Sequence, residues 1–111
     1  MEQQKIKLLV VIINRKLTEK VLADLKENLA DFMQVYYGKG TARFEILNLL
    51  GDNQSEKTII TSFVKENDVE YVLNMLKTKY NFDKPGKGIA FTISLKSISG
   101  PLSYNILSSL I

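Results

Sequence analysis

The residues best suited to chemistry in this sequence belong to a short motif that occurs twice. The pentapeptide Gly-Lys-Gly-x-Ala occupies positions 38–42 and again positions 86–90. Glycine lets the backbone approach a phosphate and point several N–H groups at it, while lysine adds a positive charge. Each copy follows an apolar run and an amphipathic stretch, so the chain reads as two related halves. The two turns, if they are brought together, are predicted to form a site for a small anion.

Candidate binding residues come from both copies of the motif and from the loop beside the second copy. The lysines are the expected charge donors, and the threonine is an expected hydroxyl donor. The full set is Gly38, Lys39, Gly40, Thr41, Lys84, Gly86, Lys87 and Gly88. The alternative is that these glycines serve only turns that need a positive φ angle. Arg15 and Arg43 could reach the same cleft, although such cations more often lie on a solvated surface.

The inventory of side chains excludes several kinds of site. The 111 residues contain no cysteine and no histidine. A disulfide framework, a thiol nucleophile, a Ser-His-Asp triad and a typical zinc site are therefore excluded. The carboxylates form no pair in an evident cleft, so we expect neither catalytic residues nor an enzyme. The net charge of +3 permits an anionic ligand without indicating the concentrated basic face of a nucleic-acid-binding protein.

The chain shows no signal for a membrane or for export. The longest apolar run, Leu8 to Ile13, is far shorter than the roughly 20 residues that a membrane-spanning helix needs. The polar start of the sequence does not match a signal peptide. We therefore expect one cytoplasmic domain over residues 1–111, with a core at 6–100 and an uncharged C-terminal extension at 101–111.

Hydrophobic patterning predicts the elements that must position the two turns. Thr18 is a predicted N-cap of a first helix, and Asn67 with Glu70 forms a predicted capping box for a second. Each helix has a buried apolar stripe, whereas the charged residues of the first helix, Asp24 among them, are expected in solvent. The predicted strands span residues 6–13, 32–37, 58–64 and 89–95.

This order of elements, β-α-β-β-α-β, predicts an α+β, ferredoxin-like fold, with a four-stranded antiparallel sheet and both helices on one face. Residues 8–13 and 89–95 are almost uniformly apolar, so these strands are expected to be buried on both faces. Oligomerisation is the simplest way to cover the second face. The less regular segment 41–55 has a turn at 51–55, which is either a partner-docking tip or a plain connection.

Three segments carry a resemblance to a known family. They are the first strand Lys7–Asn14, the turn Gly38–Thr41 after the second strand, and the loop Lys84–Gly88 that leads into the fourth strand. Together with the two-repeat layout, they make residues 6–100 resemble the PII family of signalling proteins, the nitrogen regulatory P-II proteins.

The resemblance implies a homotrimer with adenine-nucleotide sites in the clefts between subunits. ATP, ADP, AMP or cyclic AMP is then the expected effector. The first glycine pair would lie at the base of the family's T-loop, and the second in the B-loop that wraps the phosphates. The resemblance also implies docking on an unknown target protein, such as an enzyme or a membrane transporter, according to which nucleotide is bound.

The sequence departs from the family pattern in several places. The T-loop region, about 41–57, is much shorter than in the nitrogen-regulatory members, and Tyr36 and Tyr37 precede it rather than occupying its tip. Ile89 stands where the family has a B-loop lysine. Basic residues are missing after the fourth strand, where the chain reads Ser97–Gly100. The resemblance is therefore to a divergent PII-like protein, and nitrogen control in particular does not follow from it.

Two other functions stay open. One is an adaptor trimer whose nucleotide site has decayed, because Ile89 and the missing basic residues weaken the site. The other is a single-stranded RNA binder, because RRM domains share the ferredoxin-like layout and Lys87–Phe91 partly matches their RNP1 signature. That match falls on the fourth strand instead of the third, and its stacking positions hold Ile89 and Ser94. We therefore expect no nucleic-acid partner.

Overall fold

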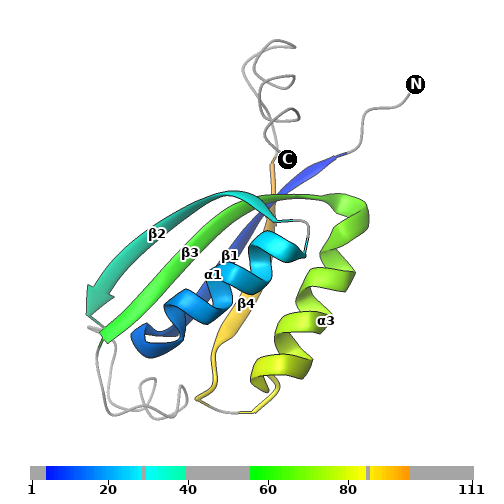
Figure 1. Ribbon diagram of the computed structural model, residues 1–111. Helices are drawn as coiled ribbons and strands as arrows, with labels where there is room; N and C mark the ends of the chain where they lie inside the picture. The colour runs from blue at the N-terminus through cyan, green and yellow to red at the C-terminus, as the bar shows by residue number, and fades with distance from the viewer. Residues whose placement is uncertain (1–4, 29, 40–55, 85, 96–111) are drawn as a thin grey trace.

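The predicted order of strands and helices is present in the structure, a computed structural model that describes residues 5–28, 30–39, 56–84 and 86–95. Figure 1 shows both α-helices on one face of a single sheet. A short 3-10 turn precedes each α-helix. The elements are β1 (Ile6–Asn14), η1 (Arg15–Leu17), α1 (Thr18–Glu27), β2 (Asp31–Lys39), β3 (Glu56–Lys65), η2 (Glu66–Asp68), α3 (Val69–Tyr80) and β4 (Ile89–Ser94). The ferredoxin-like α+β fold is confirmed.

The sheet has the strand order β2-β3-β1-β4, and all three neighbouring pairs are antiparallel. Leu8 of β1 lies opposite Phe63 of β3 on one side and opposite Ile93 of β4 on the other. The register of β2 with β3 shifts between Asp31 and Gln34, where Phe32 has a φ angle of 52°. β2 and β4 are the two edge strands, so each has one row of backbone groups that lies outside this sheet.

The hydrophobic core lies between the helices and the sheet. Val21 and Leu25 of α1 and Val72 and Leu76 of α3 are fully buried, as the spacing of the apolar residues predicted. They pack against the inward-facing residues of the central strands, such as Ile60. Each fully buried side chain of this size contributes about 1.5–3 kcal/mol through removal of apolar surface from water.

Both predicted helix starts are wrong in detail. The first turn is capped by Asn14, whose side-chain Oδ1 accepts a hydrogen bond from the Lys16 backbone N–H at 3.0 Å. Thr18 is already helical and buried, and its hydroxyl contacts the Thr58 hydroxyl at 2.7 Å. Asn67 lies inside η2, and the residue that caps α3 makes no side-chain capping bond. In each case a three-residue 3-10 turn lies between strand and helix, so Thr18 is already the first residue of α1 and Asn67 lies in the turn before α3.

The second face of the sheet is open in the single chain, so coverage of β1 and β4 on this face by oligomerisation stays a prediction. Phe91 in β4 is 40% exposed and Tyr36 in β2 is 50% exposed. Cross-strand register places the residues of this open face in three rows. The rows are Tyr36-Ile59-Ile12-Ile89, Gln34-Thr61-Val10-Phe91 and Phe63-Leu8-Ile93. The ring of Phe32 extends the third row by stacking on Phe63, with 6.1 Å between the ring centroids.

Some predictions concern parts of the chain that are not described. These are the segment 41–55 with its turn at 51–55, Arg43, and the extension at 101–111. In the described ranges, no helix has both the length and the apolar character needed to cross a bilayer.

Candidate functional site

The two Gly-Lys-Gly copies lie at the same end of the sheet but at opposite edges. β1 and β2 run in one direction and β3 and β4 in the other, so the end of β2 and the start of β4 meet the same end of the sheet (Figure 1). Two strands separate β2 from β4, and three interstrand spacings amount to about 14 Å. Within one chain, the described residues of the two copies therefore lie at opposite edges of the sheet.

The first copy starts inside a regular strand. Gly38 belongs to β2 and pairs with Lys57 of β3. Among the described residues, and apart from its two chain neighbours, a Cβ atom built on Gly38 would have no atom within 4 Å, so neither backbone conformation nor packing in this part of the chain requires glycine here. The backbone of Lys39 ends β2, while Gly40 and Thr41 lie outside the described residues.

Arg15 covers the end of this strand from the neighbouring β1–α1 connection. Its Nη2 donates to the carbonyl oxygen of Gly38 at 3.4 Å, and its Nη1 lies 3.8 Å from a carboxylate oxygen of Glu56. The guanidinium carbon is 5.1 Å from the centre of the Tyr37 ring, a cation-π geometry. Arg15 therefore bridges the residues on either side of segment 40–55, which makes it more than the solvated cation that the sequence favoured.

The second copy forms a compact loop. Asn81 ends α3 in the left-handed conformation, and its carbonyl oxygen accepts a hydrogen bond from Lys84 N–H at 3.0 Å. The N–H of Lys87 in turn donates to the carbonyl of Lys84 at 3.4 Å. Gly86 has a φ angle of 84°. The side chains of Lys84 and Lys87 are exposed, so both predicted charge donors are accessible to a ligand.

Packing explains one of the glycines in this loop. A Cβ atom built on Gly88 would lie 2.5 Å from the Phe82 ring, and the φ angle of Gly88 is 145°. Phe82 itself contacts the ring of Tyr80, with 6.0 Å between the ring centroids. For Gly88 the structural explanation is therefore sufficient, whereas Lys84 and Lys87 have no such role in packing.

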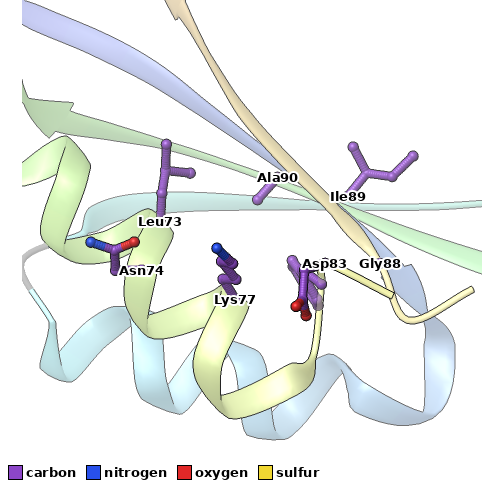
Figure 2. Close-up of a pocket in the computed structure, with 8 residues that line it drawn as sticks. Leu73, Asn74, Lys77, Asp83, Gly88, Ile89 and Ala90 are labelled. Atoms are coloured by element: carbon purple, nitrogen blue, oxygen red, sulfur yellow. The ribbon is translucent and has the colours of Figure 1, made fainter. Parts of the chain in front are cut away.

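A cavity of about 320 Å³ adjoins this loop between α3 and β4. In Figure 2 the Lys77 side chain extends from α3 toward β4, and Asp83 lies beside Gly88. The volume is at the lower end of the range for small-molecule pockets. The lining residues are Leu73, Asn74, Lys77, Phe82, Asp83, Gly88, Ile89 and Ala90.

The sequence reasoning missed the contribution of α3 to this cavity. Of the predicted set, the cavity includes Gly88 and leaves out Lys84 and Lys87. Lys77 follows Leu73 by four residues, which puts both on one side of a helix. That spacing could have identified Lys77 as a residue near the cavity, because Leu73 already belonged to the predicted apolar stripe of this helix.

A polar cluster joins the two helices next to the same loop. Lys79 Nζ lies 2.7 Å from one oxygen of Asp24, and the Tyr80 hydroxyl donates to the other. The hydrogen bonds from Lys79 and Tyr80 hold the pKa of Asp24 below its ordinary value. Burial, followed by the hydrogen bond to Asp24, raises the pKa of Tyr80.

The expectation that Asp24 is solvated is wrong, since this residue is only 9% exposed. Its position on α1 faces the C-terminal end of α3, where Lys79 and Tyr80 supply the donors that a buried carboxylate needs. The periodicity of α1 indicates only which of its residues share a face, so it could not predict the hydrogen-bond donors that α3 places beside Asp24. The cluster anchors Tyr80, which is the last residue of α3 before the loop.

No protein-family model and no curated protein matches the sequence. Solved structures do match the fold. A chain from Thermus thermophilus described as a PII-like signalling protein is 15% identical, with a TM-score of 0.62 over 86% of this chain and 90% of its own. A functionally unknown protein from Pediococcus pentosaceus is 14% identical, with a TM-score of 0.64 over 88% of this chain and 99% of its own.

A third structure contains nucleotides. CPII from Thiomonas intermedia, solved bound to ADP, AMP and acetate, is 15% identical, with a TM-score of 0.66. The match covers 93% of this chain and 97% of that chain. The described part of this chain therefore has the fold of the PII-like signalling proteins, on a sequence that has diverged far from those of its structural neighbours.

Proposed function

We propose that this protein is a PII-like signalling protein that binds a small anionic effector, an adenine nucleotide, between subunits and regulates a partner protein. The observation that carries the proposal is the position of the two Gly-Lys-Gly copies at one end of the sheet but on opposite edges. A structural neighbour that holds ADP and AMP supports the choice of ligand class. The proposed activity is binding and not catalysis.

A homotrimer accounts for both the split motif and the open face. When the β4 edge of one subunit lies beside the β2 edge of the next, the second copy of one chain meets the first copy of its neighbour. Such a head-to-tail contact repeats until the ring closes. The apolar rows around Phe91 and Ile59 are then covered by neighbouring subunits, which removes a patch that monomers rarely expose.

The oligomer can be tested separately from the ligand. Phe91→Glu puts a charge into the middle row of the open face, so we expect the trimer to dissociate into monomers that keep the helical signal. Thr78→Glu, an exposed position on α3, is the matched control and leaves the mass unchanged. Light scattering coupled to size exclusion measures both variants, and a monomeric wild-type protein would contradict the proposed assembly.

In the proposed cleft the effector phosphate lies on lysine ammonium groups and on backbone N–H groups of the two turns. Lys84 and Lys87 come from one subunit, and Lys39 and Thr41 from the next. The absence of basic residues from 97–100 and the presence of Ile89 leave fewer charges for a triphosphate. We therefore propose that the site binds ADP or AMP with higher affinity than ATP or cyclic AMP.

The proposed signalling mechanism is a shift in population. The effector binds one arrangement of the loop region at 41–57 better than another, so the partner-competent arrangement gains occupancy. The partner is an enzyme or a membrane transporter that contacts this region. A cytoplasmic location fits such a partner, because the adenine nucleotides are found there.

RNA binding is not favoured by the open face. RRM domains stack bases on aromatic residues of their central strands. Here the two central strands present a single aromatic residue, Phe63, among Leu8, Val10, Ile12, Ile59 and Thr61 on that face. A gel shift with oligo-U and mixed RNA is expected to show no complex, and a specific complex would revive this alternative.

Calorimetric titration with ATP, ADP, AMP and cyclic AMP, with and without Mg²⁺, tests the proposed function. We expect binding of at least one nucleotide at close to one per subunit. Lys87→Ala should weaken it by about 1.5–3 kcal/mol, the range for hydrogen bonds to charged groups. Lys26→Ala, an exposed lysine at the far end of α1, is the control. No heat and no thermal shift with all four nucleotides would favour the adaptor trimer instead.

A further inference from the structure

Arg15 lies at the edge where the first Gly-Lys-Gly copy begins, and its hydrogen-bond donors are poorly satisfied by the described residues. Its contact with Glu56, at 3.8 Å, is longer than a hydrogen bond, and both side chains are partly exposed at 38% and 53%. The bond to the Gly38 carbonyl, at 3.4 Å, is also long. Its Nε atom is buried without a hydrogen-bond partner among the residues that the structure describes. The guanidinium is thus held in place while its donors remain poorly satisfied.

The surroundings of this guanidinium favour an anion. The ends of the strands here carry the basic residues Arg15, Lys16, Lys39 and Lys57 and one acidic residue, Glu56. Tyr37 supports the guanidinium plane from one side. An exposed ion pair of this length is weak, so Glu56 is easily displaced by a stronger anion. A phosphate or carboxylate group instead matches the planar fork of arginine with two parallel hydrogen bonds.

We propose that Arg15 is a binding residue for an oxyanion, and that Glu56 is an internal anion that occupies Arg15 until the effector displaces it. The inference rests on the proposed function insofar as the oxyanion belongs to a nucleotide phosphate. Because Arg15 contacts both Gly38 and Glu56, displacement of Glu56 removes one of the side-chain contacts at the two strand ends, which stay paired through β2 and β3. Binding at this position is thereby linked to the base of the candidate docking loop.

The test compares four variants of the full-length protein by calorimetry. Glu56→Gln removes the competitor, so the affinity for ADP or AMP should rise about 3- to 10-fold, the size expected for a weak exposed ion pair. Arg15→Gln should lower it at least about 10-fold, the loss expected for a charge-assisted hydrogen bond. Lys26→Gln, at an exposed lysine of α1, and Glu66→Gln are the charge-matched controls. Glu66 pairs with Lys7 at 3.7 Å at the other end of the sheet.

A purely structural role for Arg15 gives a different pattern. If Arg15 and Glu56 only clamp the strands, Glu56→Gln lowers the melting temperature and lowers affinity or leaves it unchanged. In the proposed arrangement Glu56→Gln raises affinity, and it has no effect on affinity once Arg15→Gln is present. The rise in affinity is the result that a clamp does not produce, and its loss in the Arg15→Gln background shows that it acts through Arg15.

Inorganic pyrophosphate and acetate, titrated beside the nucleotides, separate this inference from the proposed function. Nucleotide binding that neither Arg15→Gln nor Glu56→Gln alters overturns the inference and leaves the proposed function standing. Pyrophosphate or acetate binding with the expected Arg15 and Glu56 pattern, in a protein that binds no nucleotide, supports the inference and overturns the proposed function. Absence of binding by every probe overturns both.

Discussion

The two Gly-Lys-Gly copies have the same sequence but meet different structural demands. Gly38 lies in a paired strand with open space around it, whereas its counterpart Gly86 lies in a loop with a φ angle of 84°. The first copy therefore continues a strand, and the second makes a turn. The internal repeat preserves the order of elements and the choice of residues without preserving backbone geometry.

The two copies also differ in how the chain holds them. Phe82 and the Tyr80–Asp24 hydrogen bond tie the second copy to the helix layer. Arg15 and pairing with β3 hold the start of the first copy. Both copies adjoin edge strands, but only the second is also held by contacts with the helix layer among the residues that the structure describes.

Gly88→Ala, in the second copy, should cause the largest loss of stability. The added methyl group would lie 2.5 Å from the Phe82 ring at a φ angle that side chains rarely adopt. Overpacking together with backbone strain predicts a loss of about 3 kcal/mol in the free energy of unfolding. Urea denaturation measures the loss. In a Phe82→Ala background, Gly88→Ala should cost far less than it does in the wild-type protein, and a simple sum of the two losses would contradict the packing explanation.

Asp24→Asn should loosen the attachment of the second copy to the helix layer. It removes the charge that accepts from Lys79 and Tyr80, so we expect a loss of about 2 kcal/mol, typical for hydrogen bonds to a charged group. Glu27→Gln, an exposed carboxylate on the same helix, is the control and should stay within about 0.5 kcal/mol. Equal stabilities of the two variants would show that the cluster contributes nothing.

Gly86→Ala and Gly38→Ala test the comparison at matched positions. The positive φ angle at Gly86 predicts a loss of about 1–2 kcal/mol with alanine. At Gly38 the backbone is extended and open, so alanine should leave stability unchanged within about 0.5 kcal/mol or raise it slightly. Similar losses at the two positions would mean that both copies make the same turn, contrary to the structure.

The cluster of Asp24, Lys79 and Tyr80 should also have a smaller effect on how stability varies with pH. Because folding lowers the pKa of Asp24, its contribution is present above the ordinary value of 3.8 and is lost as the pH falls below that value. Because folding raises the pKa of Tyr80, its contribution is present below the ordinary value of 10.0 and is lost as the pH rises above that value. Urea unfolding across the pH range checks this, and Tyr80→Phe should remove the alkaline loss due to this group.

The sequence was sufficient to predict the fold because the elements are locally consistent. The apolar stripes of both helices, such as Val72 with Leu76, and the four strand segments each point to one type of element. It was insufficient for contacts between elements. The burial of Asp24 depends on hydrogen-bond donors from another helix. The contacts of Arg15 depend on how the paired ends of β2 and β3 lie beside the β1–α1 connection. The apolar rows of the open face agree with the expectation that oligomerisation covers them, which stays a prediction.

The most direct test of the central claim is complementation between two variants. Lys39→Ala disables the first copy and Lys87→Ala the second, and the two chains are co-expressed with different tags so that mixed trimers can be isolated. If each site combines the two copies from neighbouring subunits, either variant alone binds nucleotide weakly. Mixed trimers then regain at least one site of wild-type affinity in a calorimetric titration. Mixed trimers that bind as weakly as both parents would contradict the account, because the two copies would then act within a single chain or not at all.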